Sequence, residues 1–149
     1  MKLSVDLKEF IALLNSRKIK YLLVGGHAVG FHGLPRFTED IDFLIETSPE
    51  NAALVAAAAN DFVSVDLGFK PEDFRVPETV IQFGRPPNRI DLLTSVTAVS
   101  FDEAWKTRIK GNLDGVPISV ISKELLIRNK TATARPQDLA DVARITKKT

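Results

Sequence analysis

The stretch that decides the fold is YLLVGGHAVGFHGLPRFTEDIDFLIE, residues 21–46. Its first apolar run, Tyr21–Val24, is short and stops at the pair Gly25-Gly26, which predicts a buried strand that ends where a helix begins. After a Gly-Leu-Pro break, residues 38–45 mix acidic and apolar side chains and predict a second strand. Acidic residues inside a buried strand need a positive partner, so this second strand also carries information about function.

Two aspartates one residue apart stand in that second strand. Alternation places Asp40 and Asp42 side by side on one face, and Asp91 lies in NRIDLLTSV, the other strand-like run with an embedded aspartate. If the two strands are neighbours, three carboxylates converge on one patch. Like charges and partial burial raise the pKa of such carboxyl groups unless a cation joins them. The pattern therefore predicts a site for a hard divalent cation, Mg²⁺ or Mn²⁺.

The glycine pair indicates a phosphate site. A strand that ends in Gly25-Gly26 before a helix presents backbone N–H groups and the positive end of the helix dipole, and glycine lets a phosphate approach the backbone closely. Protein-bound magnesium usually completes its shell with water and substrate phosphate, so the two sites suit one another. Arg36, two residues before the predicted strand, is a candidate phosphate ligand or a structural partner of Glu39 or Asp40.

The remaining elements do not follow a regular βαβ alternation. A capping box of Asp6 and Glu9 predicts the first helix, and Ser48-Pro49 predicts the start of another. Further helices are expected over residues 27–31, 101–107 and 122–130 and from Pro136 onward, and strands over 79–83, 89–94, 108–111 and 116–121. The order predicts an α+β fold in one minimal domain, residues 1–149, with a small mixed β-sheet flanked by helices and closed by helices from about residue 122 to 149.

Composition narrows the functional classes. A net charge of +1 and a pI near 8.0 do not by themselves indicate a nucleic-acid binder. The absence of cysteine excludes disulfides and thiolate catalysis. The longest apolar run, AALVAAAA, is too short to span a bilayer, and the charged N-terminus MKLSVDLKEF has no signal core, so a cytoplasmic location is expected.

Four blocks of the chain resemble a known family. An apolar-Gly-Gly motif, thirteen residues, Asp-Ile-Asp and a later strand aspartate resemble the nucleotidyltransferase superfamily of DNA polymerase beta. More narrowly, GGHAVGFHGLPRFTEDIDFLIE, PPNRIDLLTSV, FDEAW and KTATARPQDLADVARI resemble small prokaryotic nucleotidyltransferase-like proteins related to AbiEii-type toxins. The resemblance runs from Tyr21 to Ile145.

The resemblance implies roles for the motif residues. Gly25 and Gly26 would cradle a nucleoside triphosphate (NTP), Asp40 and Asp42 would hold two metal ions, and Asp91 would share the metal nearer the attacking hydroxyl and help to deprotonate it. The reaction would transfer a nucleoside monophosphate (NMP) with loss of pyrophosphate. One departure is that many superfamily members have Gly-Ser where this chain has Gly-Gly, so a phosphate-binding hydroxyl is missing.

The tail block adds cationic candidates. Similar proteins place basic groups there that face the triphosphate, and in this chain the block contains Lys130 and Arg135. For each of these two residues, a purely structural role is the alternative to phosphate binding. Asp138 and Asp141 are three residues apart on the last predicted helix and are interpreted as capping and salt-bridge groups.

Two classes of function follow. The first is an enzyme that transfers an NMP to a hydroxyl of RNA (tRNA) or of protein, as a component of a toxin–antitoxin system with a cognate partner protein; RNA is favoured because toxins among such small proteins modify tRNA. The alternative is a non-catalytic nucleotide-binding or antitoxin-like module with the same fold. A third option, metal-dependent hydrolysis of a phosphate ester, would use the same acids and release phosphate.

Overall fold

The computed structural model describes residues 2–33, 35, 38–63 and 67–146. A mixed β-sheet with the strand order β3-β4-β2-β1-β6-β5 forms its centre. Strand β2 is parallel to β4 and antiparallel to β1, whereas β1 and β6 are parallel and the pairs β3–β4 and β5–β6 are antiparallel. This confirms the predicted α+β fold. The strands are β1 (Tyr21–Val24), β2 (Asp40–Ile45), β3 (Val80–Phe83), β4 (Arg89–Leu93), β5 (Ile109–Leu113) and β6 (Val116–Val120).

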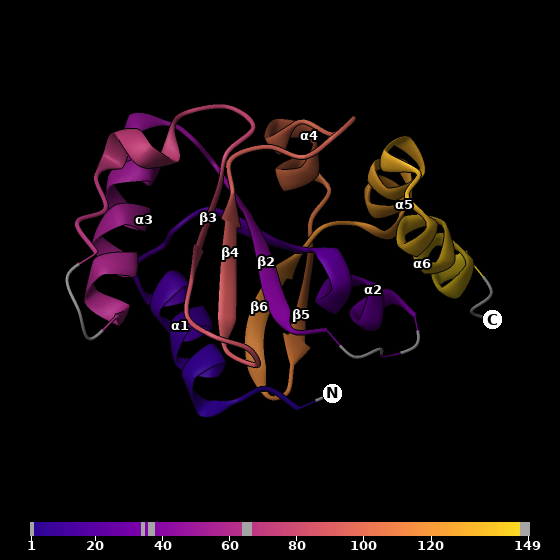
Figure 1. Ribbon diagram of the computed structural model, residues 1–149, viewed down its shortest axis with the longest axis horizontal. Coiled ribbons are helices and arrows are strands. Elements are labelled where there is room, and N and C mark those ends of the chain that lie inside the picture. Colours follow the sequence, from indigo (N-terminus) through magenta and orange to yellow (C-terminus); the bar gives the residue numbers. More distant parts are fainter. Residues whose placement is uncertain (1, 34, 36–37, 64–66, 147–149) are drawn as a thin grey trace.

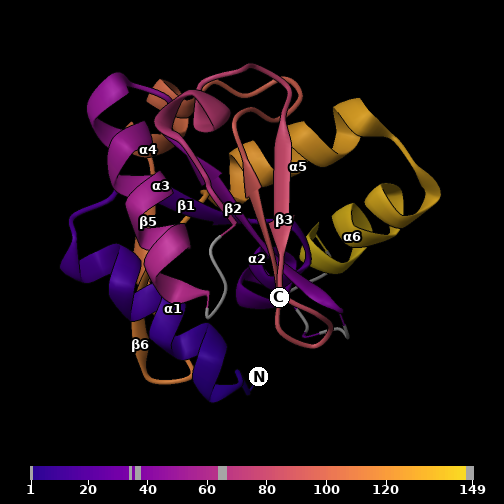
Figure 2. The same ribbon diagram turned by 60° about the vertical axis from the view of Figure 1, so that its left-hand side comes forward.

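Helices cover both faces of this sheet. Helices α1 (Val5–Ser16) and α3 (Pro49–Phe62) lie on one side, and α2 (Gly25–His32), α5 (Lys123–Thr133) and α6 (Pro136–Thr146) lie on the other (Figures 1 and 2). A short α4 (Phe101–Lys106) and a 3₁₀ turn, η1 (Pro71–Phe74), complete the elements. Across the residues that the structure describes, no helix combines the length and the apolar character needed to cross a membrane.

The core fixes the orientation of β2. Ile41, Phe43 and Ile45 are fully buried, and the Phe43 ring contacts Phe10 of α1 and Tyr21 of β1 with centroids 5.9 and 5.6 Å apart. Because side chains alternate along a strand, burial of these residues towards α1 turns the aspartates of β2 to the opposite face. The predicted division of faces on β2 is confirmed.

Most of the predicted elements are present, with local corrections. The capping box at the first helix is wrong: Ser4 is the N-cap, and its hydroxyl accepts a hydrogen bond from the Leu7 N–H at 3.2 Å. Helix α2 begins at Gly25 itself. Strand β5 extends two residues beyond its predicted end, because the NLDG turn closes over Asp114 and Gly115 alone. The η1 turn was not predicted.

Candidate active site

Three carboxylates converge on the face of the sheet that α2, α5 and α6 cover. In the parallel register of β2 and β4, Asp42 is paired with Asp91, and Asp40 with Arg89. Asp40, Asp42 and Asp91 each offer one oxygen, and these oxygens all lie within 4.8 Å of one another. The expected adjacency of the two strands is therefore confirmed. An all-oxygen donor set of this size fits a hard divalent cation such as Mg²⁺ or Mn²⁺.

The electrostatics of the cluster support the same fit. Burial raises the pKa of Asp42 to about 8, and the charges of Asp40 and Asp91 add to the effect, while Lys130 opposes it. Burial also raises the pKa of Asp40, with a further contribution from its hydrogen bond to Asp91. The carboxylates thus lack sufficient positive charge around them, which a divalent cation would supply.

One charged residue of the cluster was missed by the sequence analysis. The Arg89 guanidinium donates from Nη2 to Asp40 Oδ2 at 3.0 Å, and from Nε and Nη2 to the two oxygens of Asp91 at 3.2 Å each. A signal was available in the sequence. Arg89 stands two residues before Asp91 on a predicted strand, so both side chains had to share one face.

Gly25 brings the start of α2 against the acids. Its φ of +69° lies in the left-handed region, and a Cβ added there would overlap the carboxylate of Asp42. Val24 is the N-cap residue of α2, and no side chain of the described residues caps this end. Gly25 and Gly26 line the same cavity as the acids, so the uncapped start of α2 lies beside them.

Replacement of Gly25 by alanine is expected to move Asp42 and to abolish any activity that depends on this carboxylate, because the new methyl group and the carboxylate cannot share one position. Gly68→Ala is a matched control, since Gly68 has a φ of +66° and nothing within 4 Å of an added Cβ. Both variants should lose about 1 kcal/mol of stability from backbone strain, and only Gly25→Ala should lose activity. Equal activity in the two variants would show that the contact with Asp42 is unimportant.

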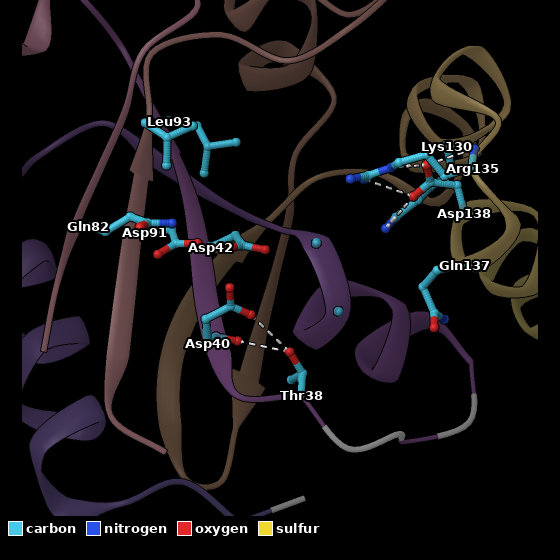
Figure 3. A pocket seen from close by; sticks show the side chains of 13 residues that line it. Thr38, Asp40, Asp42, Gln82, Asp91, Leu93, Lys130, Arg135, Gln137 and Asp138 are labelled. Carbon is cyan, nitrogen blue, oxygen red and sulfur yellow. Dashed lines mark hydrogen bonds and ion pairs between the residues drawn. The ribbon is translucent and has the colours of Figure 1, made fainter. Parts of the chain in front are cut away.

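The opposite wall of the cavity carries cations. Lys130 and Arg135 line the same 420 Å³ cavity as the three acids. Figure 3 shows Asp42 and Asp91 on the sheet and Lys130 and Arg135 on the helical side. Lys130 Nζ lies 3.0 Å from Asp141 Oδ2 and 3.4 Å from Asp138 Oδ1. The two predicted basic residues are therefore brought to the site, but each already has an acidic partner.

Asp138 is the centre of this second network. Burial alone would raise its pKa, but hydrogen bonds from the side chains of Arg135 and Thr133 and from the Arg135 N–H hold the pKa well below its usual range. The interpretation of Asp138 and Asp141 as capping and salt-bridge groups is confirmed. Arg36, the remaining predicted phosphate ligand, lies outside the described residues.

Comparison with known proteins assigns the family. The profile described as "Nucleotidyl transferase AbiEii toxin, Type IV TA system" matches residues 12–145. The chain belongs to the AbiEii family. This membership supports an enzyme that transfers NMP groups and belongs to a toxin–antitoxin class. A search of curated proteins found no match.

Solved structures of nucleotidyltransferases share the fold of this AbiEii-family chain. LnuA, a lincosamide antibiotic adenylyltransferase with bound lincomycin, aligns with a TM-score of 0.63 and 15% identity over 99% of this chain and 98% of its own. The TM1012 protein of Thermotoga maritima, assigned as a nucleotidyltransferase, aligns with a TM-score of 0.61 and 15% identity over 92% of this chain and 88% of its own. A nucleotidyltransferase-like antigen of Paracoccidioides brasiliensis aligns with a TM-score of 0.53 and 16% identity over 96% of this chain and 75% of its own. At these identities the likeness concerns the fold alone.

Proposed function

We propose that this AbiEii-family chain is a metal-dependent nucleotidyltransferase that moves an NMP from an NTP to a hydroxyl of an acceptor, RNA and in particular tRNA before protein. The observation that carries the proposal is one cavity lined by three carboxylates with the start of α2 beside them, and by Lys130 and Arg135 of the helical side. Such a cavity suits a cation-bridged polyphosphate. The cytoplasm, where NTPs and Mg²⁺ are abundant, is the proposed location, with a cognate antitoxin protein as partner.

The acids and glycines have distinct proposed roles. Asp40, Asp42 and Asp91 would hold Mg²⁺ or Mn²⁺, which neutralises the phosphate charge that develops during transfer. The backbone amides at Gly25 and Gly26 would receive triphosphate oxygens, without the hydroxyl that a serine would add.

The positive charges of Lys130 and Arg135 are balanced by neighbouring carboxylates, and this limits the roles that we propose for them. Lys130 and Arg135 carry two positive charges, and Asp138 and Asp141, which pair with them, carry two negative charges. Polyphosphate charge must therefore be met mainly by the metal and by the α2 amides, with Lys130 and Arg135 supplying hydrogen bonds. Arg36 is proposed as an additional phosphate ligand.

A turnover assay tests the proposal. The full chain with Mg²⁺ or Mn²⁺ and a labelled NTP is expected to label tRNA and to release pyrophosphate, and the double variant Asp40→Ala, Asp42→Ala should do neither. Label on protein instead would identify the other acceptor class. Release of inorganic phosphate without labelling would indicate hydrolysis, and NTP binding without turnover would indicate a binding module. Equal labelling by the double variant would refute the mechanism.

Binding of Mg²⁺ is expected to strengthen as pH rises towards about 8. The pKa of Asp42 is raised to about 8 in the metal-free protein, so below that value a proton must leave before the carboxylate can bind a cation. Affinity should rise by up to about tenfold per pH unit below about 8 and then level off. Titration calorimetry in buffers of different ionisation enthalpy would measure both the affinity and the released proton. Constant affinity between about pH 6 and about pH 8 would contradict the expectation.

A further inference from the structure

Arg89 occupies the place of a cation among the acids. It extends from β4 opposite Asp40 in the strand register and forms a fork on Asp91 with a third contact to Asp40, at 3.0 to 3.2 Å. Two carboxylates that belong to different strands are thereby joined through one guanidinium. The fork geometry makes this a directional contact as well as a charge pair.

The oxygens that Arg89 uses are the oxygens that a metal would need. Both oxygens of Asp91 and Oδ2 of Asp40 accept hydrogen bonds from Arg89, and the Thr38 hydroxyl donates to Asp40 Oδ1 at 3.1 Å. Asp42 is the one member of the trio that receives no hydrogen bond from Arg89. A cation held by Asp42 and either neighbouring acid must therefore compete for an oxygen that already accepts a hydrogen bond.

We propose that Arg89 is an internal counterion of the acidic cluster that the entering metal displaces. The proposal rests on the metal site of the proposed function. A guanidinium and a divalent cation sharing one carboxylate repel each other, and the Arg89 side chain, which is 34% exposed, can swing on its flexible stem away from the acids. Before the metal arrives, Arg89 holds the acids of β2 and β4 together as a positioning residue. Its competition makes free metal bind weakly, and the phosphates of a metal-bound NTP offer the released guanidinium a new partner.

Binding of Mn²⁺ alone tests the proposal. With chelator-treated full chain, titration calorimetry or the electron paramagnetic resonance signal of free Mn²⁺ should give about tenfold tighter binding for Arg89→Met than for the wild type, from the loss of the positive charge that competes for the same carboxylates. Arg89→Gln, which keeps hydrogen-bonding capacity without the charge, should also bind Mn²⁺ more tightly. Arg89→Lys, which keeps the charge, should stay close to the wild type.

A matched control separates a local effect from net charge. Arg85→Met removes an exposed arginine from the turn that leads into the same strand, and it should leave Mn²⁺ affinity within about twofold of the wild type because surface charges are screened by solvent. Thermal unfolding gives a second readout. In chelator Arg89→Met should melt below the wild type, since the acids lose their counterion, and saturating Mn²⁺ should raise its Tm by more than it raises that of the wild type.

The contrary results are equally definite. Weaker or unchanged Mn²⁺ binding by both Arg89→Met and Arg89→Gln would overturn the proposal, and so would the absence of Mn²⁺ binding in every variant. No arm of the experiment uses a nucleotide or an acceptor. A failure of NMP transfer with normal Mn²⁺ binding would therefore reject the proposed function while leaving the role of Arg89 to be decided by these titrations.

Discussion

Asp42→Asn is expected to lower the proposed NMP transfer by about a thousandfold or more, because loss of one of the proposed metal ligands removes several kcal/mol of transition-state stabilisation. The same change should stabilise the metal-free protein by roughly 1–3 kcal/mol near neutral pH. Asp42 would thus destabilise the metal-free protein and at the same time be the residue on which activity depends most. Transfer assays and thermal unfolding in chelator, on the same two proteins, measure both effects.

The raised pKa of Asp42 determines the direction in which the stability of the metal-free protein changes with pH. Because the folded-state pKa of Asp42 is raised to about 8, the folded chain holds a proton that the unfolded chain releases near its ordinary pKa of about 4. The stability of the metal-free protein should therefore fall as pH rises from about 4 to about 8, and this slope should be smaller in Asp42→Asn.

An exposed aspartate provides the control for Asp42. Asp102→Asn changes a solvent-exposed acid in the first turn of α4 and should alter stability by less than about 1 kcal/mol. If Asp42→Asn destabilised the protein in chelator, the carboxylate would be making a net favourable contact in the metal-free state.

Lys130→Met is expected to produce the largest loss of stability, about 3–5 kcal/mol. Lys130 is buried, and it contacts Asp138 and Asp141, whose side chains are 1% and 0% exposed. Without the ammonium group these carboxylates keep neighbours such as Gln137, which donates to Asp141 at 3.0 Å, but lose a compensating charge. Denaturant unfolding of the two proteins measures the effect.

A second variant decides which role of Lys130 dominates. Adding Asp141→Asn to Lys130→Met removes one of the two carboxylates that lost the ammonium group and should recover part of the stability, in the manner of a double-mutant cycle. If Lys130→Met instead kept full stability and lost NTP binding, the ammonium would serve the nucleotide and the buried pair would be incidental.

Local signals were sufficient for most of the individual elements of the fold. The Ser48-Pro49 start of α3 and the GRPPN and NLDG turns depend on side-chain and backbone preferences within a few residues, which the sequence displays directly. The strand order depends on which apolar faces pack together, and the parallel pair β1–β6 joins segments about a hundred residues apart. Local preferences carry no such information.

In the site, too, some features follow from local sequence and others depend on how the elements pack. Alternation within β2 and the embedded acid of β4 were enough to predict that Asp40, Asp42 and Asp91 meet. The acidic partners of Lys130 depend on how α5 packs against α6, which local sequence does not show, and a phosphate contact of Lys130 stays a prediction. The place of Arg89 beside Asp91 follows from alternation along β4, whereas its contact with Asp40 depends on the parallel register of β2 and β4, which local preferences do not show.

Helix α2 has a consequence for the size of the substrate. Its eight residues pack against β1 and β2 on one side and against α5 and α6 on the other, and a Cβ at Gly33 would come within 3.2 Å of the Arg144 carbonyl oxygen. The helix thus acts as a spacer whose thickness, about 10 Å with side chains, keeps the sheet and the C-terminal helix pair apart. Substitutions that thicken this spacer far from the acids are expected to widen the gap between the acids and Lys130, and with it the size of the molecule that fits, without altering any of the proposed site residues.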